Sequence, residues 1–315
     1  MAGGLLSTVG AMLAKIESPY GTATPDAGDA ILIESGGLPF SIKADNHPRK
    51  VVRTSPIQEP HVIGARAWAI SFQTELKNGG TAGTPTTFGE LIQAAGFLET
   101  DNGTTDETYT PLITNGKSVT LWYYENGQKY TASGVRFGSM KISAKVAERV
   151  MVAFEGMGLY AAPADVAIIA SPTPDTTEPP VFLGGTFTFN AFAATVRAFE
   201  LEVSTGLAER RSFSAATGYA GFQHTAFEFK GKVTCEAELV ADQPWIANYI
   251  AADNAVLDMT IGSTAGNKID IDGPRCRVES VAFGDDNGIR TVEIGFTMHD
   301  SAPGTFNDAL TIKLY

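Results

Sequence analysis

The chain has 315 residues and a formal net charge of −12, from 23 basic and 35 acidic side chains. This length allows two domains of about 150 residues, while the acidic balance argues against a conventional nucleic-acid binder, because duplex affinity comes mainly from cationic contacts to phosphate. Apolar runs stay short of the roughly 18 residues that a membrane span needs. The two cysteines, Cys235 and Cys276, are too few for a disulfide scaffold and are interpreted as core thiols in a reducing cytoplasm.

Residues 1–38 are predicted to form an N-terminal arm that includes a short helix over residues 2–16. A second helix is predicted over residues 87–97, because its apolar side chains recur at helical spacing and Gly96 suits a C-cap. Polar and Gly-rich composition predicts loops over residues 77–85 and 98–115. Asn126-Gly127 predicts a hairpin turn. Strands are predicted over residues 38–44, 50–55, 66–76, 118–124, 129–133, 135–142 and 149–156.

Residues 161–182 are predicted to link a first β domain, residues 39–160, to a second, residues 183–315. This linker contains five prolines, and Pro-rich stretches behave as semi-rigid spacers. The second domain is predicted to contain a helix over residues 244–251 that begins at Pro244. Its strands are predicted over residues 199–203, 210–213, 225–239, 256–261, 268–271, 275–283, 290–298 and 310–314.

The two domains follow the same order of elements. Residues 67–76 and residues 230–239 are alternating, strand-like segments that both end in Glu-Leu, and each is followed by a helix, a hairpin and a Gly-x-Arg strand. This conserved order predicts a tandem duplication. The copies differ in charge: residues 1–163 carry thirteen basic and fifteen acidic side chains, which leaves ten basic and twenty acidic for the rest.

Motifs for catalysis or cofactor binding are missing from the sequence. The histidines are scattered, at positions 47, 61, 224 and 299, and no nucleophile elbow or phosphate-binding loop is present. Asp270-Ile271-Asp272-Gly273 lacks the further oxygen ligands of a calcium loop. We therefore expect no enzyme activity, no cofactor and no metal site, although a glycosidase-type carboxylate pair stays open on sequence grounds.

Strict alternation in the second domain predicts strands with one buried face and one solvated face. In residues 227–239 the apolar set is Phe227, Phe229, Val233, Cys235, Ala237 and Leu239. The opposite, carboxylate-rich set is Glu228, Lys230, Lys232, Thr234, Glu236 and Glu238. Glu200 and Glu202 alternate with apolar residues in the same way.

Several segments in sequence order resemble the major tail tube protein of long, non-contractile phage tails. The resemblance covers most of residues 15–160, and the second domain resembles the same family more weakly. The segments that carry it are Glu17-Ser18-Pro19-Tyr20, Ala94-Ala95-Gly96-Phe97, Tyr109-Thr110-Pro111, Trp122-Tyr123-Tyr124, Ser133-Gly134-Val135-Arg136 and Phe154-Glu155-Gly156.

The resemblance implies a mainly β chain with two tandem tail-tube domains of β-sandwich or barrel type, each with a flanking helix. Such domains close into rings of six, so three duplicated chains are expected to make one ring of a virion tail tube assembled in the bacterial host cytoplasm. Expected partners are the chain itself, the tape measure, tail terminator and distal tail proteins, and double-stranded DNA that passes without specific binding; no membrane is expected.

The acidic balance then suggests a bore that repels DNA over a Debye length of about 8–10 Å. The candidate bore residues are Glu75, Glu200, Glu202, Glu228, Glu236 and Glu238. The N-terminal arm, both long loops and the linker are expected to carry contacts within and between rings. Alternative readings are the tube of a contractile tail or type VI-like secretion system, and a β-sandwich adhesin or decoration protein.

Overall fold

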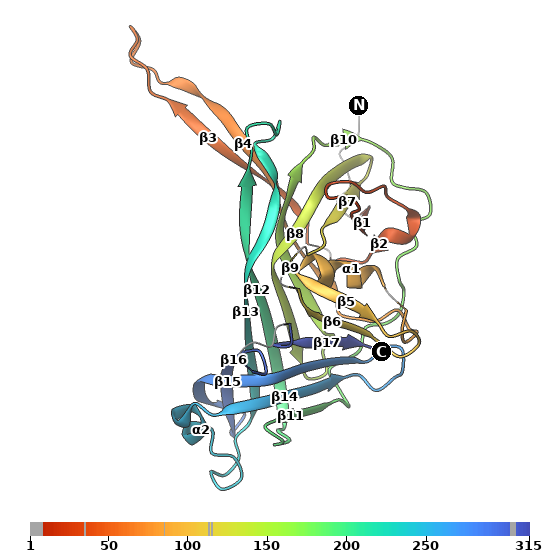
Figure 1. The fold of residues 1–315 in the computed structure, drawn as a ribbon, viewed down its shortest axis with the longest axis vertical. Coiled ribbons are helices and arrows are strands. Elements are labelled where there is room, and N and C mark those ends of the chain that lie inside the picture. The colour runs from red at the N-terminus through yellow and green to blue at the C-terminus, as the bar shows by residue number, and fades with distance from the viewer. Residues whose placement is uncertain (1–8, 35, 85, 113, 115, 303–306) are drawn as a thin grey trace.

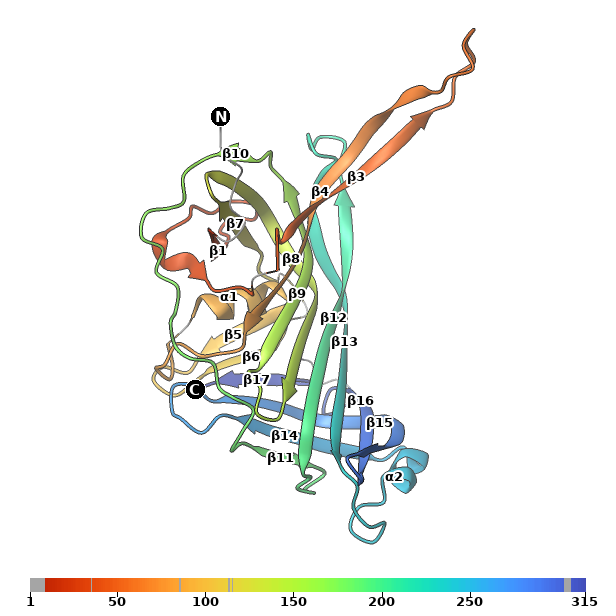
Figure 2. The same cartoon turned by 180° about the vertical axis from the view of Figure 1, so that it is seen from behind.

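The computed structural model describes residues 9–34, 36–84, 86–112, 114, 116–302 and 307–315. Its strands join into one large sheet that bends through both halves of the molecule (Figure 1), and the reverse view shows the same continuous course (Figure 2). The predicted mainly β class is confirmed. We call residues 9–160 the first half and residues 183–315 the second half. No helix in the described ranges is long and apolar enough to cross a membrane.

The first half is a ladder of antiparallel strands with one helix on its apolar face. Its spatial order is β1 (Gly10–Ile16), β7 (Val119–Glu125), β8 (Gln128–Lys145), β9 (Met151–Tyr160), β4 (Glu59–Glu75) and β3 (Phe40–Arg49), with β2 (Ala30–Ile31) beside β1. Helix α1 (Thr87–Ala94) packs Phe88 against Phe154 at 6.2 Å between ring centroids. The predicted turn is confirmed, since Asn126 and Gly127 both have positive φ.

The second half repeats this arrangement. Its spatial order is β11 (Thr186–Phe189), β14 (Asn254–Ile261), β15 (Ile269–Asp286), β16 (Ile289–Met298), β13 (Tyr219–Glu236) and β12 (Val196–Arg211). In chain order and in space these strands match β1, β7, β8, β9, β4 and β3. Helix α2 (Trp245–Ala251) lies in the predicted range, with Pro244 as its N-cap and not its first residue, and only Trp245 among its residues is buried.

Two strand pairings join the halves. Residues 139–145 of β8 pair with residues 198–204 of β12, and we call this pairing the internal joint. The last strand, β17 (Thr311–Leu314), pairs with β6 (Glu107–Pro111) of the first half. One core runs through both halves and includes the contact between Phe97 and Phe229, whose ring centroids lie 6.5 Å apart. The halves are therefore packed as one body.

Three predictions about local structure were wrong. Residues 10–16 form β1 and not a helix; residues 2–8 lie outside the described ranges. Because Met12, Leu13 and Ala14 are all buried, β1 shows no alternation, and a short apolar run of this kind does not separate strand from helix. Residues 50–55 are the tip of the β3–β4 hairpin. The predicted loop 98–115 overlaps the hairpin of β5 (Phe97–Asp101) and β6. Its polar side chains gave it the composition of a loop.

The predicted boundaries in the second half also needed correction. Leu239 was assigned to the buried face but is 74% exposed, because β13 ends at Glu236. The ladders place Glu75 opposite Met151 and Glu236 opposite Thr291. The structural counterpart of Glu75 is thus Glu236, two residues before the Glu238 that the sequence comparison aligned with it.

The N-terminal segment is held by a buried carboxylate. Glu17 accepts hydrogen bonds from Gly21 N at 2.7 Å, Ser118 Oγ at 2.6 Å, Thr120 Oγ1 at 2.6 Å and Gly134 N at 2.5 Å. Tyr20 then reaches the second half: its hydroxyl donates to Gly134 O and accepts from Phe222 N, both at 3.0 Å. This polar cluster is structural, since its donors and acceptors satisfy one another.

The linker packs along the surface of the first half. Thr173 N donates to Ala27 O at 2.9 Å. Lys77 Nζ, at the start of the predicted loop 77–85, donates to Asp175 O at 2.8 Å and Thr177 O at 2.9 Å. Loop and linker therefore contact each other inside the chain.

Candidate functional site

A largely solvated polar surface lies on the strands that surround the internal joint. One row of directly opposed residues crosses six strands of both halves: Gln73, Ala153, Lys141, Glu202, Lys230 and Thr297. A neighbouring row runs through Glu75, Met151, Ser143, Glu200 and Lys232. We call this surface the polar face.

The residues that alternate with these rows are apolar and buried. They include Phe72, Phe154, Ile142, Leu201, Val233 and Ile294. Since side chains on successive strand residues point to opposite sides, the apolar set fills the core under α1 and the polar set faces outward. The internal joint makes this two-sided surface continuous from the first half to the second.

The structure brings five of the six predicted carboxylates to strands of the polar face. Glu200 and Glu202 lie on β12, and Glu228 and Glu236 lie on β13. Glu75 occupies the position on β4 that corresponds to Glu236. Glu238 is exposed but lies beyond the end of β13, so it is not part of the ladder.

The polar face carries paired charges. Lys141 Nζ lies 2.9 Å from Glu200, Lys230 Nζ lies 2.8 Å from Glu228, and Lys232 Nζ lies 2.9 Å from Glu293. At the ends of the strands Arg197 contacts Glu236 at 2.9 Å and Arg149 contacts Glu75 at 2.6 Å. The hydrogen bond that Lys230 donates to Glu228 raises the pKa of Lys230, and the hydrogen bond that Lys232 donates to Glu293 raises the pKa of Lys232. The face is therefore of mixed charge.

Sequence reasoning placed Lys230 and Lys232 on this surface but missed Lys141 and the ion pairs that cross between strands. Lys141 was placed on a strand of the first domain, and Glu200 on a strand of the second. Only the pairing of β8 with β12 brings them together. The alternation of each strand predicted which residues face solvent, but it carries no information about the neighbour across the ladder.

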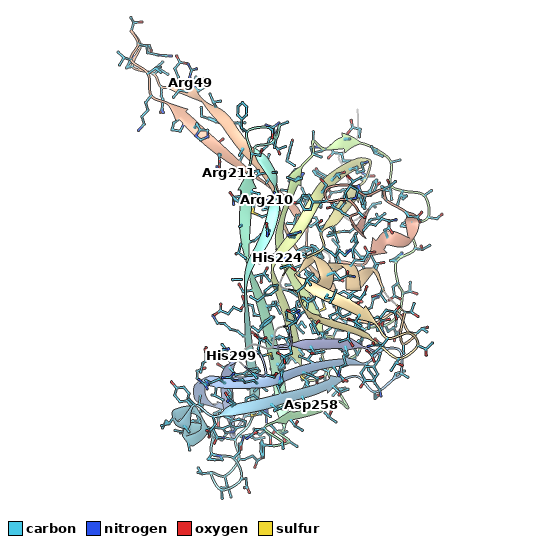
Figure 3. The ribbon with its side chains drawn as sticks, in the orientation of Figure 1. Arg49, Arg210, Arg211, His224, Asp258 and His299 are labelled. Atoms are coloured by element: carbon cyan, nitrogen blue, oxygen red, sulfur yellow. The ribbon has the colours of Figure 1, made fainter. Side chains whose placement is uncertain are left out.

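The isolated titratable groups have structural explanations. His224 sits in the centre of the molecule (Figure 3), where burial lowers its pKa to about 4 and its Nε2 lies 3.0 Å from Phe137 O. Burial raises the pKa of Cys235 to about 11 and that of Cys276 to about 12, so both are unreactive thiols at neutral pH. His299 lies apart in the second half (Figure 3).

The acidic segment of β15 is internally paired as well. Asp272 contacts Lys313 Nζ at 3.0 Å, and Asp270 accepts a hydrogen bond from Tyr315 OH at 3.2 Å. Within the residues that the structure describes, no group of three or more histidine, cysteine or acidic side chains could hold a metal ion. These observations leave the polar face as the candidate functional surface.

A β-hairpin arm extends away from the body beside this surface. It is formed by β3 and the first part of β4, and Arg49 lies far out along it (Figure 3). At its base Lys43 contacts Glu209 at 2.7 Å and Asp45 contacts Arg211 at 2.8 Å, which ties the arm to the β12–β13 hairpin. Beyond the base its side chains are largely exposed.

Comparison with known proteins gives one family. The model of the phage tail tube protein family matches residues 7–298. The matched region includes every strand of the polar face and both sides of the internal joint. No curated protein matches the chain.

Proposed function

The chain belongs to the phage tail tube protein family, and on that premise we propose that three copies close into a ring and that stacked rings form the tube of a long, non-contractile tail. The tube conducts double-stranded DNA during genome ejection. The protein is a structural component of the virion tail, without enzyme activity, and is assembled in the host cytoplasm.

A tandem duplication of one tube unit underlies this stoichiometry. The two halves share the chain order and the spatial order of six strands, with a helix at the same point of each. Both also have a bulge at the same place, between Phe137 and Ser139 in β8 and between Val278 and Ser280 in β15. Two fused units per chain make three chains equivalent to a ring of six units.

The polar face is the proposed wall of the bore, and its continuity across the internal joint is the observation that carries the proposal. A conduit needs an uninterrupted solvated surface, and its apolar side must be covered from outside. The chain has both, since α1 packs on the apolar side through Phe88. The surrounding ring would supply the same surface from the other copies.

Mixed charge suits a passage that must not retain DNA. Carboxylates repel phosphate, and each lysine held by a carboxylate at 2.8–2.9 Å presents less net positive charge than a free one. The proposed bore residues remain Glu75, Glu200, Glu202, Glu228 and Glu236, with Glu238 near the end of a strand. The tape measure, tail terminator and distal tail proteins are the further partners we propose.

Negative-stain microscopy of the concentrated protein tests the proposed assembly. We expect hollow tubes or rings with three chains each, measured by mass. A stable monomer that binds glycans would instead identify an adhesin or decoration protein. Tubes that recruit a sheath would point to a contractile tail or a type VI-like system.

A charge reversal tests the bore. Replacing Glu200, Glu202, Glu236 and Glu238 with Lys is expected to leave tube assembly intact and to slow genome ejection from assembled particles. A matched variant with the same four residues changed to Gln separates repulsion from attraction, and we expect a smaller delay. Unchanged ejection kinetics in the Lys variant would count against the bore assignment.

A further inference from the structure

Among the strand edges without a pairing partner in the described part of the chain, two belong to β3 and β15. The outer edge of β3 has no pairing partner there, since β3 pairs with β4 alone. Residues 279–286 of β15 pair with β16 on one side only, because β14 and β17 pair with earlier residues of β15. Helix α2 contacts β15, yet in residues 279–286 every side chain except that of Val281 is exposed. Unpaired edges of this kind are templates for another strand.

The internal joint shows how such edges fit together. It pairs β8 of the first half with β12 of the second, from Lys145 opposite Ala198 to Ser139 opposite Ser204. In the repeated strand order, β15 is the counterpart of β8 and β3 is the counterpart of β12. The pairing that joins the halves therefore has a second version, between a β15 edge and a β3 edge, that is unoccupied within the single chain.

Cross-strand partners match each residue of the first half with its counterpart in the second, starting from Glu75 with Glu236. Across the two ladders the correspondences are Phe154 with Ile294, Ile142 with Phe283, Met140 with Val281, Phe40 with Leu201, Ser41 with Glu202 and Ile42 with Val203. Because β8 and β15 have a bulge at the same position, the same residue correspondence holds on both sides of it.

Exposure differs sharply between the corresponding residues. Val203 is 1% exposed at the internal joint, whereas Ile42 is 59% exposed. Ile142 is 1% exposed, whereas Phe283 is 45% exposed. The apolar residues at the open edges are thus those whose counterparts are buried by the internal joint.

We propose that β3 of one copy pairs antiparallel with residues 280–283 of β15 in a second copy, in the register of the internal joint. This places Phe40 opposite Phe283, Ser41 opposite Ala282 and Ile42 opposite Val281. The contact buries the exposed apolar side chains and continues the polar face into the next chain. It rests on the proposed ring assembly, for which it supplies the contact between chains.

The contact is head-to-tail, because β3 and β15 are different surfaces of each copy. A head-to-tail contact closes a ring when its rotation divides a full turn. Within the chain the same joint relates one half to the next, so alternating internal and intermolecular joints keep one repeated geometry around the ring.

Disulfide trapping tests the register. Directly opposed antiparallel residues have Cα atoms about 4.5–5.5 Å apart, which suits a disulfide. In the assembled protein, Ser41→Cys combined with Ala282→Cys is expected to give covalent oligomers up to trimers on a non-reducing gel. Each single variant should remain monomeric there, since Cys235 and Cys276 are buried. Lys141→Cys with Glu202→Cys is the matched control at the internal joint and should cross-link only within a chain.

A second pair of variants tests the same edges without cysteine chemistry. Ile42→Asp and Phe283→Asp are each expected to abolish assembly while the isolated chain stays folded, as judged by circular dichroism. Leu239→Asp, at a still more exposed apolar residue away from both edges, should assemble normally. Tubes formed by Ile42→Asp and by Phe283→Asp would contradict the proposed pairing of β3 with β15. So would normal tubes of the Ser41→Cys, Ala282→Cys protein without any cross-link between chains. Neither result would contradict the tube function. Absence of tubes from the unmodified protein would instead contradict the tube function itself.

Discussion

The two halves of the molecule have one strand order but differ in how much of their apolar surface is covered. In the first half six residues of α1 are buried, and β12 pairs with the edge of β8. In the second half α2 buries only Trp245 of its residues, and the corresponding edge of β15 is exposed. The same strand arrangement is therefore completed within the chain in the first half and left with an open edge in the second.

Loss of the buried Glu17 carboxylate, which anchors the N-terminal segment to the first half, should destabilise the chain most. Glu17→Ala removes the acceptor of four hydrogen bonds, leaving buried donors without a partner, and should lower the free energy of unfolding by about 3–5 kcal/mol. Urea denaturation of the unassembled chain measures it. The exposed Glu148, paired with Lys145 at 3.1 Å, is the control: Glu148→Ala should cost less than about 1 kcal/mol. Equal losses would show that the Glu17 cluster is not an anchor.

Truncations at corresponding positions distinguish the covered edge of β8 from the open edge of β15. Ile142→Ala should cost about 2–5 kcal/mol because Ile142 is fully buried at the internal joint. Phe283→Ala at the corresponding open edge should cost less than about 1 kcal/mol in the unassembled chain. Chemical denaturation below the assembly concentration distinguishes the two, and similar values would contradict the assignment of β15 as an open edge.

A pH dependence probes the second contact between the halves, where β6 meets β17. Burial, followed by the nearby carboxylates of Glu99 and Asp101, raises the pKa of Glu107 to about 7. The folded chain therefore keeps a proton that the unfolded chain has lost above its ordinary pKa of about 4.3. By linkage, the stability from this group is greatest below that value and falls as the pH rises towards about 7.

Glu107→Gln removes this titration. Between pH 5 and pH 8 the difference in stability between the variant and the wild type should change by about 1–3 kcal/mol in favour of the variant. Burial also raises the pKa of Glu90 to about 7, so Glu90 contributes equally to both proteins and cancels in the comparison. Thermal unfolding at several pH values measures the difference; parallel curves would rule out the raised pKa of Glu107.

The smallest expected effect concerns the ion pairs of the polar face. The Lys141–Glu200 pair is about half exposed, and pairs of this kind contribute about 0.2–1 kcal/mol. A double-mutant cycle with Lys141→Ala and Glu200→Ala should give a coupling free energy in that range at low salt. It should disappear near 1 M salt, where the Debye length is about 3 Å. A coupling unaffected by salt would mean that the pair is more buried than the structure shows.

Patterns within single strands predicted much of the fold. Alternation assigned Phe229, Val233 and Cys235 to the core, and Asn126-Gly127 located a hairpin. Prediction failed where neighbours change the pattern: β1 is buried on both faces, and β6 is polar yet lies between β5 and β17. The candidate carboxylates were found as solvated residues together with Lys230 and Lys232, but Lys141 was not, because it reaches Glu200 from a strand distant in sequence.

By itself the sequence determined the strand periodicity, both helices, the recurring order of elements and the excess of carboxylates in the second half, since these depend on residues close together in the chain. The tertiary structure decided which edges meet. Hydrogen bonds between β8 and β12 join the two halves into one surface, turn isolated charges into ion pairs and leave β3 and β15 open. Strand edges carry the same backbone donors and acceptors whatever the side chains, so only the packed fold selects the partners.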